Sequence, residues 1–129
     1  MKMPCRFCRP NLRNEEIVLE SDHCCCRFIQ NEQPVLLGSG LIIPKLHRET
    51  VFDLTVEEWT DTYHLTRKVK GLLNELHHPD GFNLGWNSGA VAGQEILHAH
   101  LHIIPRYRDE LYAGKGIRYW LKQEANSRT

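Results

Sequence analysis

Three histidines alternate with apolar residues in the run His98-Ala-His100-Leu-His102-Ile-Ile. Side chains alternate across a β-strand, so the three imidazoles are expected on one face, at steps of about 6 to 7 Å. Neutral imidazole is a good nucleophile towards phosphorus, and its ordinary pKa of about 6.5 keeps much of it neutral at physiological pH. Histidines at this spacing also bind zinc in several enzymes. The strand taken alone favours metal binding over covalent phosphoryl chemistry.

A glycine-containing segment, Asn87-Ser-Gly-Ala-Val-Ala-Gly-Gln94, precedes the histidines and reverses that preference. Gly89 and Gly93 leave backbone N–H groups free to point at an anion. A phosphate held there could lie against His100, and the loop amides and a flanking imidazole could offset the charge of the transition state. A strand that only binds metal needs no anion cradle, so the segment indicates a nucleophilic role for His100.

The unbroken run from Asn87 to Arg106 resembles the signature of the histidine triad (HIT) family of nucleotide hydrolases and transferases. The resemblance implies that His100 takes the nucleotidyl group covalently and that His102 donates to a phosphate oxygen or to the departing group. It also implies an AMP-containing nucleotide substrate. The substrate-binding residues that it assigns are Asn31 at the ribose, Asn87 near the phosphate, and Gly93 and Gln94 in the loop.

We therefore expect a nucleotidyl hydrolase that acts on dinucleoside polyphosphates or on related phosphoanhydrides and phosphoramidates. A nucleotidyl phosphorylase or transferase, or a non-catalytic nucleotide-binding adaptor, are the alternatives. Two departures from the family pattern bear on this choice: Glu95 stands where many members have Ser or Thr, and Leu37-Gly-Ser39 replaces a frequent Pro-Gly-His. A carboxylate close to a polyphosphate is repulsive, so Glu95 puts assistance to the leaving group in doubt.

Cys5-Arg-Phe-Cys8 has the two-residue spacing of a zinc site, and no second Cys-x-x-Cys follows. Relatives that carry this pair complete it with two histidines, and the resemblance places those at His47 and His98. Two thiolates and two imidazoles give a closed structural Zn²⁺ site. The alternative is a pair of reduced thiols.

Composition narrows the class of protein. The chain has 129 residues, a length that predicts one HIT domain over 1–129. It has 16 basic and 16 acidic residues, so no bulk charge draws it to nucleic acid or to a membrane surface. No apolar run is long enough for a signal peptide or a membrane span. Five cysteines, three of them adjacent at Cys24 to Cys26, favour a reducing compartment and a cytoplasmic location.

The order of patterns predicts an α+β, HIT-like fold, an antiparallel sheet with one long helix packed on it. Strands are expected over 16–20, 24–30, 36–43, 82–86 and 96–105. The helix should begin at the capping box Thr55-Val-Glu-Glu58 and end at His77-His78-Pro79. Its predicted buried stripe contains Trp59, Tyr63, Val69, Leu72, Leu73 and Leu76. The resemblance implies a homodimer, which would protect a sheet edge.

Overall fold

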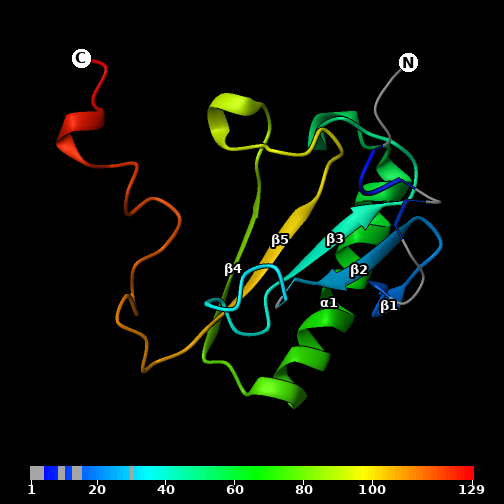
Figure 1. Ribbon diagram of the computed structural model, residues 1–129, viewed down its shortest axis with the longest axis horizontal. Helices are drawn as coiled ribbons and strands as arrows, with labels where there is room; N and C mark the ends of the chain where they lie inside the picture. The colour runs from blue at the N-terminus through cyan, green and yellow to red at the C-terminus, as the bar shows by residue number, and fades with distance from the viewer. Residues whose placement is uncertain (1–4, 9–10, 13–15, 30) are drawn as a thin grey trace.

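The computed structural model describes residues 5–8, 11–12, 16–29 and 31–129. Its centre is a five-stranded antiparallel sheet in the order β1-β2-β3-β5-β4. The strands are β1 (Leu19–Glu20), β2 (Cys24–Phe28), β3 (Gly40–Pro44), β4 (Gly81–Trp86) and β5 (Leu101–Arg106). One long helix, α1 (Val56–His77), lies across one face of the sheet (Figure 1). The predicted α+β architecture is confirmed.

The helix begins and ends where the sequence indicates. The Thr55 side chain accepts a hydrogen bond from the Glu58 backbone N–H, and the Glu58 carboxylate accepts one from the Thr55 N–H. This reciprocal capping satisfies donors that the first turn of a helix leaves free. At the other end His78 adopts the left-handed conformation, with φ of 51°, and Pro79 follows. A helix does not continue through such a pair.

The buried face of α1 differs from the predicted stripe. Its buried residues are Glu58, Thr62, Leu65, Val69 and Leu73. The prediction was wrong for Trp59, Tyr63 and Leu76, which are about half exposed. Residues one position apart on a helix differ by about 100° in direction, so Trp59 and Tyr63 project beside the buried row that starts at Glu58. Two polar residues are tolerated inside because both are hydrogen-bonded, Thr62 to the Glu58 carbonyl at 2.7 Å.

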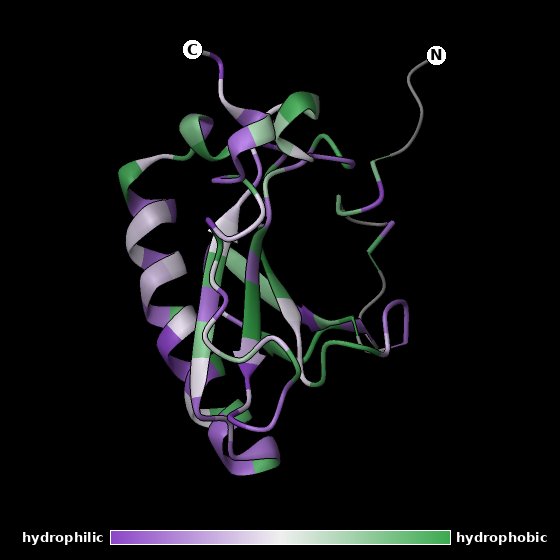
Figure 2. Ribbon diagram, turned by 90° about the vertical axis from the view of Figure 1, so that its left-hand side faces the viewer, coloured by the Kyte–Doolittle hydropathy of each residue, from purple (hydrophilic) through white to green (hydrophobic). Residues whose placement is uncertain are grey.

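Each face of the sheet carries its own cluster of buried side chains. The helix side contains Cys24, Cys26, Ile42, Leu65, Val69, Leu73, Leu101 and Ile103. The opposite side contains Phe7, Leu12, Cys25, Leu41 and Ile43. Figure 2 shows the sheet edge-on, with α1 along one side and the N-terminal segment on the other. The three adjacent cysteines alternate between the two clusters, as a strand requires, and all three are buried.

Four strands are shorter than predicted, and the second of them ends at Phe28. The first covers only Leu19–Glu20. The third begins at Gly40 instead of Leu36, because a turn with Gly38 at φ of 81° precedes it. The last begins at Leu101 instead of Ile96, because the Ala99 N–H donates to the Arg48 carbonyl at 2.7 Å and not to a strand. His98 and His100 therefore lie in the segment just before β5, and His98 is part of a bend.

The C-terminal segment leaves β5 and runs past the β4 edge of the sheet (Figure 1). Arg106 anchors it, donating to the Asn83 side chain at 2.5 Å and to the backbone carbonyls of Tyr112 and Lys115.

Within the described ranges, no helix combines the length and apolar character that a bilayer span requires.

Candidate functional site

The loop before the histidines has the backbone shape that the glycines suggest. Gly89 has φ of 93° and Gly93 has φ of 97°, and between them lies the short 3-10 helix η3 (Ala90–Ala92). Both φ values favour glycine over other residues. Gly93 lies against Asn87, since a Cβ there would be 3.5 Å from the Asn87 amide nitrogen.

Gln94 holds this loop closed. Its side-chain oxygen accepts from the Gly89 N–H at 2.9 Å, and its nitrogen donates to the carbonyls of Glu49 and Ile96 at 2.7 and 3.0 Å. The side chain is buried. Both ends of the amide are thus bonded within the protein, and Gln94 acts on the site through the shape of the loop.

His100 is buried with one ring nitrogen fixed in place. Its Nδ1 lies 2.8 Å from the backbone carbonyl of His98. A carbonyl only accepts, so Nδ1 carries the proton and Nε2 keeps a lone pair. This is the tautomer that a histidine nucleophile needs.

His102 follows on the same face and lines the same cleft. Its ring centroid lies 5.0 Å from that of His100. Burial lowers the pKa of His102, and the neighbouring His100 lowers it further. His102 is therefore neutral near pH 7 and offers one N–H donor beside His100.

A contact network from the start of α1 positions the histidine segment. Arg48 donates through Nε to both Glu58 carboxylate oxygens, at 2.9 and 3.1 Å, and the Arg48 carbonyl accepts from the N–H of Ala99. Burial raises the pKa of Glu58, but hydrogen bonds from Thr55 and Arg48 outweigh it and hold that pKa below its usual value. Glu58 was recognised in the sequence only as a capping residue, and its pairing with Arg48 had no local signal.

A cleft of about 470 Å³ opens in front of the two histidines. Its lining residues are Arg6, Phe7, Arg27, Ile29, Glu32, Leu41, Asn87, Gly93, Glu95, Ile96, His100 and His102. The structure thus brings together four of the residues predicted to act on substrate: His100, His102, Asn87 and Gly93. Asn31 lies in an exposed turn and is not part of the lining. Arg6, Arg27 and Glu32 line the cleft and were not expected from the sequence.

The two departures from the family pattern also have definite positions. Glu95 is exposed and lines the cleft, where its carboxylate adds negative charge beside the histidines. Ser39 is buried and accepts a hydrogen bond from the Gln33 side chain. Ser39 thus supports the turn before β3.

Next to the cleft, the predicted metal ligands Cys5, Cys8, His47 and His98 converge, with all four ligand atoms within 4.8 Å of one another. The Nδ1 atom of His98 lies 3.3 Å from Cys5 Sγ and 3.4 Å from Cys8 Sγ. His47 Nδ1 lies 3.2 Å from Cys8 Sγ.

The protonation of His98 suits a ligand. Its Nε2 lies 2.8 Å from the Pro44 carbonyl, so Nε2 carries the proton and Nδ1 presents its lone pair to the thiols. Burial lowers the pKa of His98, and the neighbouring His47 and His100 lower it further. The first histidine of the motif thus faces the cluster, and the second and third face the cleft.

Comparison with known proteins identifies the class. The model of the HIT domain family matches residues 12–109, so the chain belongs to the HIT domain family. It is 37% identical over 118 residues to the adenylylsulfatase HINT3 of Arabidopsis thaliana, covering 88% of this chain and 58% of that protein. It is 33% identical over 99 residues to a bis(5'-adenosyl)-triphosphatase of Dictyostelium discoideum, covering 77% of this chain and 66% of that protein. This chain thus spans about three fifths to two thirds of the length of these relatives.

The fold is shared with solved structures. A HIT family protein from Bacillus anthracis superposes with a TM-score of 0.66 at 35% sequence identity, covering 73% of this chain and 65% of that one. The comparison confirms the HIT-like fold predicted from the sequence.

Proposed function

We propose that this protein is a nucleotidyl hydrolase that works through a covalent nucleotide on His100. The observation that carries the proposal is the hydrogen bond from His100 Nδ1 to the His98 carbonyl, because it leaves Nε2 as a nucleophile in the cleft. Nε2 attacks the α-phosphorus, a P–N bond forms, and the bond from phosphorus to the leaving oxygen breaks. Water then attacks phosphorus and breaks the P–N bond, which releases a nucleoside monophosphate.

The surrounding groups support both steps. His102 donates its N–H to a phosphate oxygen or to the departing group. The loop from Gly89 to Gly93 shapes the wall of the cleft beside the phosphate, and its own N–H groups at Gly89, Ala92 and Gly93 are bonded within the protein. Asn87, which lies against that loop, adds an amide donor at the phosphate.

Dinucleoside polyphosphates are the substrate class that we propose first. The names of the two relatives support a substrate that contains AMP. Nucleotide phosphoramidates and mixed anhydrides remain within the same chemistry, because each presents an α-phosphorus with a leaving group on the far side from His100.

We also propose that the cluster beside the cleft holds a structural Zn²⁺ ion. Ligand atoms about 2.0 to 2.3 Å from a tetrahedral ion lie about 3.3 to 3.8 Å apart, and the sulfur–nitrogen distances of 3.2 to 3.4 Å are close to that spacing. When bound, the ion cross-links its four ligands. Cys5 and Cys8 then hold the segment that carries Phe7 against His98, and Phe7 in turn contacts His100 with ring centroids 5.2 Å apart.

A homodimer that joins two sheets along β4 is the assembly that we propose. As an edge strand, β4 offers unpaired backbone groups. Beside it, Trp59, Tyr63 and Leu84 line an apolar groove of about 340 Å³ and are each 44% to 55% exposed. Burial of this groove by a second copy explains why these apolar side chains are on the surface.

The experiment that tests the proposed activity compares wild type with His100→Asn on a panel of dinucleoside polyphosphates and on adenosine phosphoramidate. We expect turnover to fall about a thousandfold or more, with nucleotide binding and bound zinc retained, because His100 is assigned neither to the metal nor to the core. Near-normal turnover by the variant would contradict the nucleophile. A wild type that binds AMP and turns over no member of the panel would favour the adaptor.

A further inference from the structure

One row of side chains crosses the face of the sheet that α1 leaves uncovered, from β5 to β2. Leu41 is the direct partner of His102 between β3 and β5, and Arg27 is the direct partner of Leu41 between β2 and β3. Direct partners project on the same face. Neighbouring strands are about 4.8 Å apart, so the Arg27 backbone lies about 10 Å from that of His102. This span is comparable to the reach of a nucleotide from its phosphorus to the far edge of its base.

Apolar side chains occupy the part of the cleft between these ends. Phe7, Ile29, Leu41 and Ile96 line it together. Flat apolar surface accepts the face of a base, whereas the phosphate belongs with the histidines and the glycine loop. A nucleotide with its phosphorus at His100 therefore directs the edge of its base towards Arg27.

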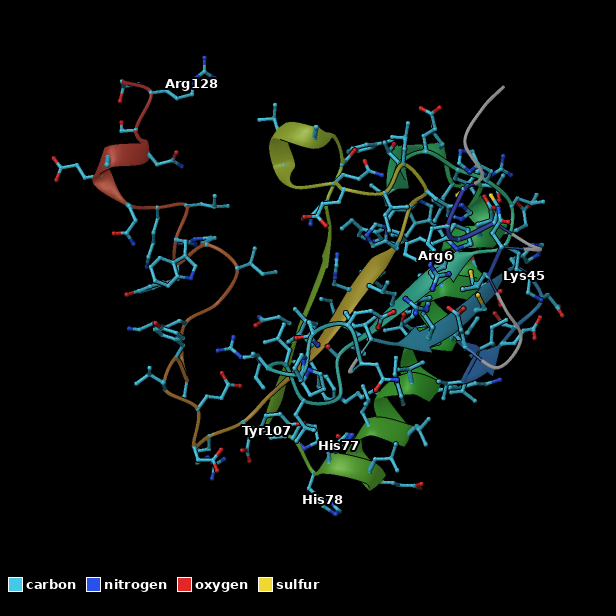
Figure 3. The ribbon with its side chains drawn as sticks, in the orientation of Figure 1. Arg6, Lys45, His77, His78, Tyr107 and Arg128 are labelled. Carbon is cyan, nitrogen blue, oxygen red and sulfur yellow. The ribbon has the colours of Figure 1, made fainter. Side chains whose placement is uncertain are left out.

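Arg27 is an unusual residue for the floor of such a cleft. It is 7% exposed, and arginine is rarely buried this far unless it is paired. Its Nη2 lies 2.5 Å from Glu32 and 3.2 Å from Glu16, and Arg6 lies 2.7 Å from the same Glu16 oxygen. Figure 3 shows Arg6 beside the N-terminal segment, on the β2 and β3 side of the sheet. These four side chains thus form a chain of alternating charges, which lies where the base of the nucleotide is expected.

Two side chains of this ion-pair cluster have polar atoms that could form further hydrogen bonds. Arg27 Nε is buried, and among the described residues it has no hydrogen-bond acceptor. A buried donor without a partner requires an explanation, and it shows that the bonding of the Arg27 guanidinium is incomplete in this structure. The Glu32 side chain is 51% exposed and uses one oxygen for Arg27. Its carboxylate can accept further hydrogen bonds from a ligand.

From this arrangement we propose that the cleft selects guanosine over adenosine for the nucleoside that becomes attached to His100. Guanine presents an acceptor, O6, beside two donors, N1–H and the 2-amino group. Arginine is the commonest partner of the guanine O6 and N7 acceptors. The Glu32 carboxylate accepts from the two donors, and a guanidinium of the cluster donates to O6.

Adenine fits the same groups poorly. Its edge has one donor, the 6-amino group, next to the acceptor N1, and it has no 2-amino group. The N1 lone pair would face the Glu32 carboxylate, leaving two acceptors opposed. Polar groups left without partners are the strongest basis for rejecting an analogue.

The inference rests on the proposed function and makes it more specific. A mixed dinucleoside polyphosphate with one guanosine and one adenosine would bind with guanosine in the cleft. Attack at the guanosine α-phosphorus releases the adenosine polyphosphate first, and water then releases GMP. The substrate can therefore contain AMP while GMP is the group carried by His100.

The test is calorimetric binding of GMP, IMP and AMP to wild type, to Glu32→Gln and to Glu57→Gln. Glu57 is exposed on the first turn of α1, away from the cleft lining, and is the matched control. Wild type and the control should bind GMP about 10- to 100-fold more tightly than AMP, with IMP between them because it lacks only the 2-amino group. A glutamine side chain both donates and accepts hydrogen bonds, as the edge of adenine does. Glu32→Gln should therefore lower the ratio of GMP affinity to AMP affinity at least tenfold. A purely structural ion pair would weaken both nucleotides alike.

A second variant covers the arginine. Arg27→Met should reduce GMP affinity towards that of AMP, and thermal melting of each variant separates this from loss of fold. Equal affinity of wild type for GMP and AMP, or an unchanged ratio in Glu32→Gln, would overturn the inference and leave the hydrolase intact. Failure of every nucleotide to bind would overturn the proposed function as well.

Discussion

The two faces of the sheet are held together by different kinds of interaction. On the helix side, Leu65, Val69 and Leu73 pack against apolar side chains of the strands. On the open side, a smaller apolar cluster is joined by specific polar contacts: a thiol and imidazole cluster, a clamped loop and a chain of ion pairs. Apolar packing tolerates changes that conserve volume, whereas polar contacts of this kind require particular atoms. The helix side therefore fixes the fold, and the open side determines whether the site has its working geometry.

The largest effect is expected at the metal cluster. Cys8→Ser should lose zinc and lower the free energy of unfolding by more than about 4 kcal/mol, because metal binding and folding are coupled. Elemental analysis and thermal melting measure the two quantities. Cys25→Ala is the control, since it removes a buried sulfur on the same side of the sheet that is not one of the four proposed ligands. A wild type free of zinc, with unchanged melting, would contradict the proposed site.

On the helix side, the expected change affects stability alone. Leu73→Ala should lower the free energy of unfolding by about 2 to 5 kcal/mol, because the side chain is fully buried and leaves a cavity. Zinc content and KM should stay at the wild-type values at temperatures where the variant is folded. Denaturant unfolding and steady-state kinetics measure both. Loss of zinc from this variant would show that the two faces are not separable.

Glu58 connects the two faces, so its replacement should affect both. Glu58→Gln should lower the free energy of unfolding by about 1 to 3 kcal/mol, because the buried contact with Arg48 loses its charge. The folded pKa of Glu58 is below its ordinary value, so the carboxylate stabilises the fold above an unfolded pKa of about 4.3. That contribution disappears as pH falls through the folded pKa. The stability difference between wild type and Glu58→Gln should therefore shrink in acid, which denaturant unfolding at a series of pH values measures.

The smallest effect is expected at Glu95. Glu95→Ser removes a negative charge from the cleft and restores the hydroxyl frequent in the family, so turnover of a dinucleoside polyphosphate should rise about three- to tenfold. The gain in turnover should be larger for a dinucleoside tetraphosphate than for a phosphoramidate, whose leaving group is neutral. Glu124→Ser, in the C-terminal segment, is the matched control. A fall in turnover would mean that Glu95 assists the reaction.

Local patterns predicted the parts of the molecule that depend on local contacts. The capping box at Thr55 and Glu58 predicted the start of α1 because both partners lie within one turn. The alternation of histidines indicated that His100 and His102 share a site, but His98, which precedes β5, belongs to the thiol cluster and does not line the cleft. The start of β5 was misplaced because the Ala99 N–H bonds to Arg48, about fifty positions earlier in the chain. No pattern near Ala99 contains that contact.

The missed cleft residues have the same explanation. Arg27 sits in a strand of apolar residues, and its pairing with Glu16 and Glu32 makes its burial favourable. Sequence order does not reveal those pairs. Trp59 and Tyr63 were expected inside because they are aromatic, yet their direction on the helix places them at the β4 edge. Their hydrophobic character predicted that these residues would be covered, but it did not identify the surface that covers them.

Trapping the covalent intermediate is the most direct test of the proposed mechanism. Wild type is mixed with a dinucleoside polyphosphate labelled on its α-phosphorus, quenched during turnover in base and examined by mass spectrometry of its peptides. We expect a nucleotide on the peptide that contains His100, lost on mild acid treatment because the bond is P–N, and absent in His100→Asn. Full turnover with no labelled protein at any quench time, or a label that persists in His100→Asn, would contradict it.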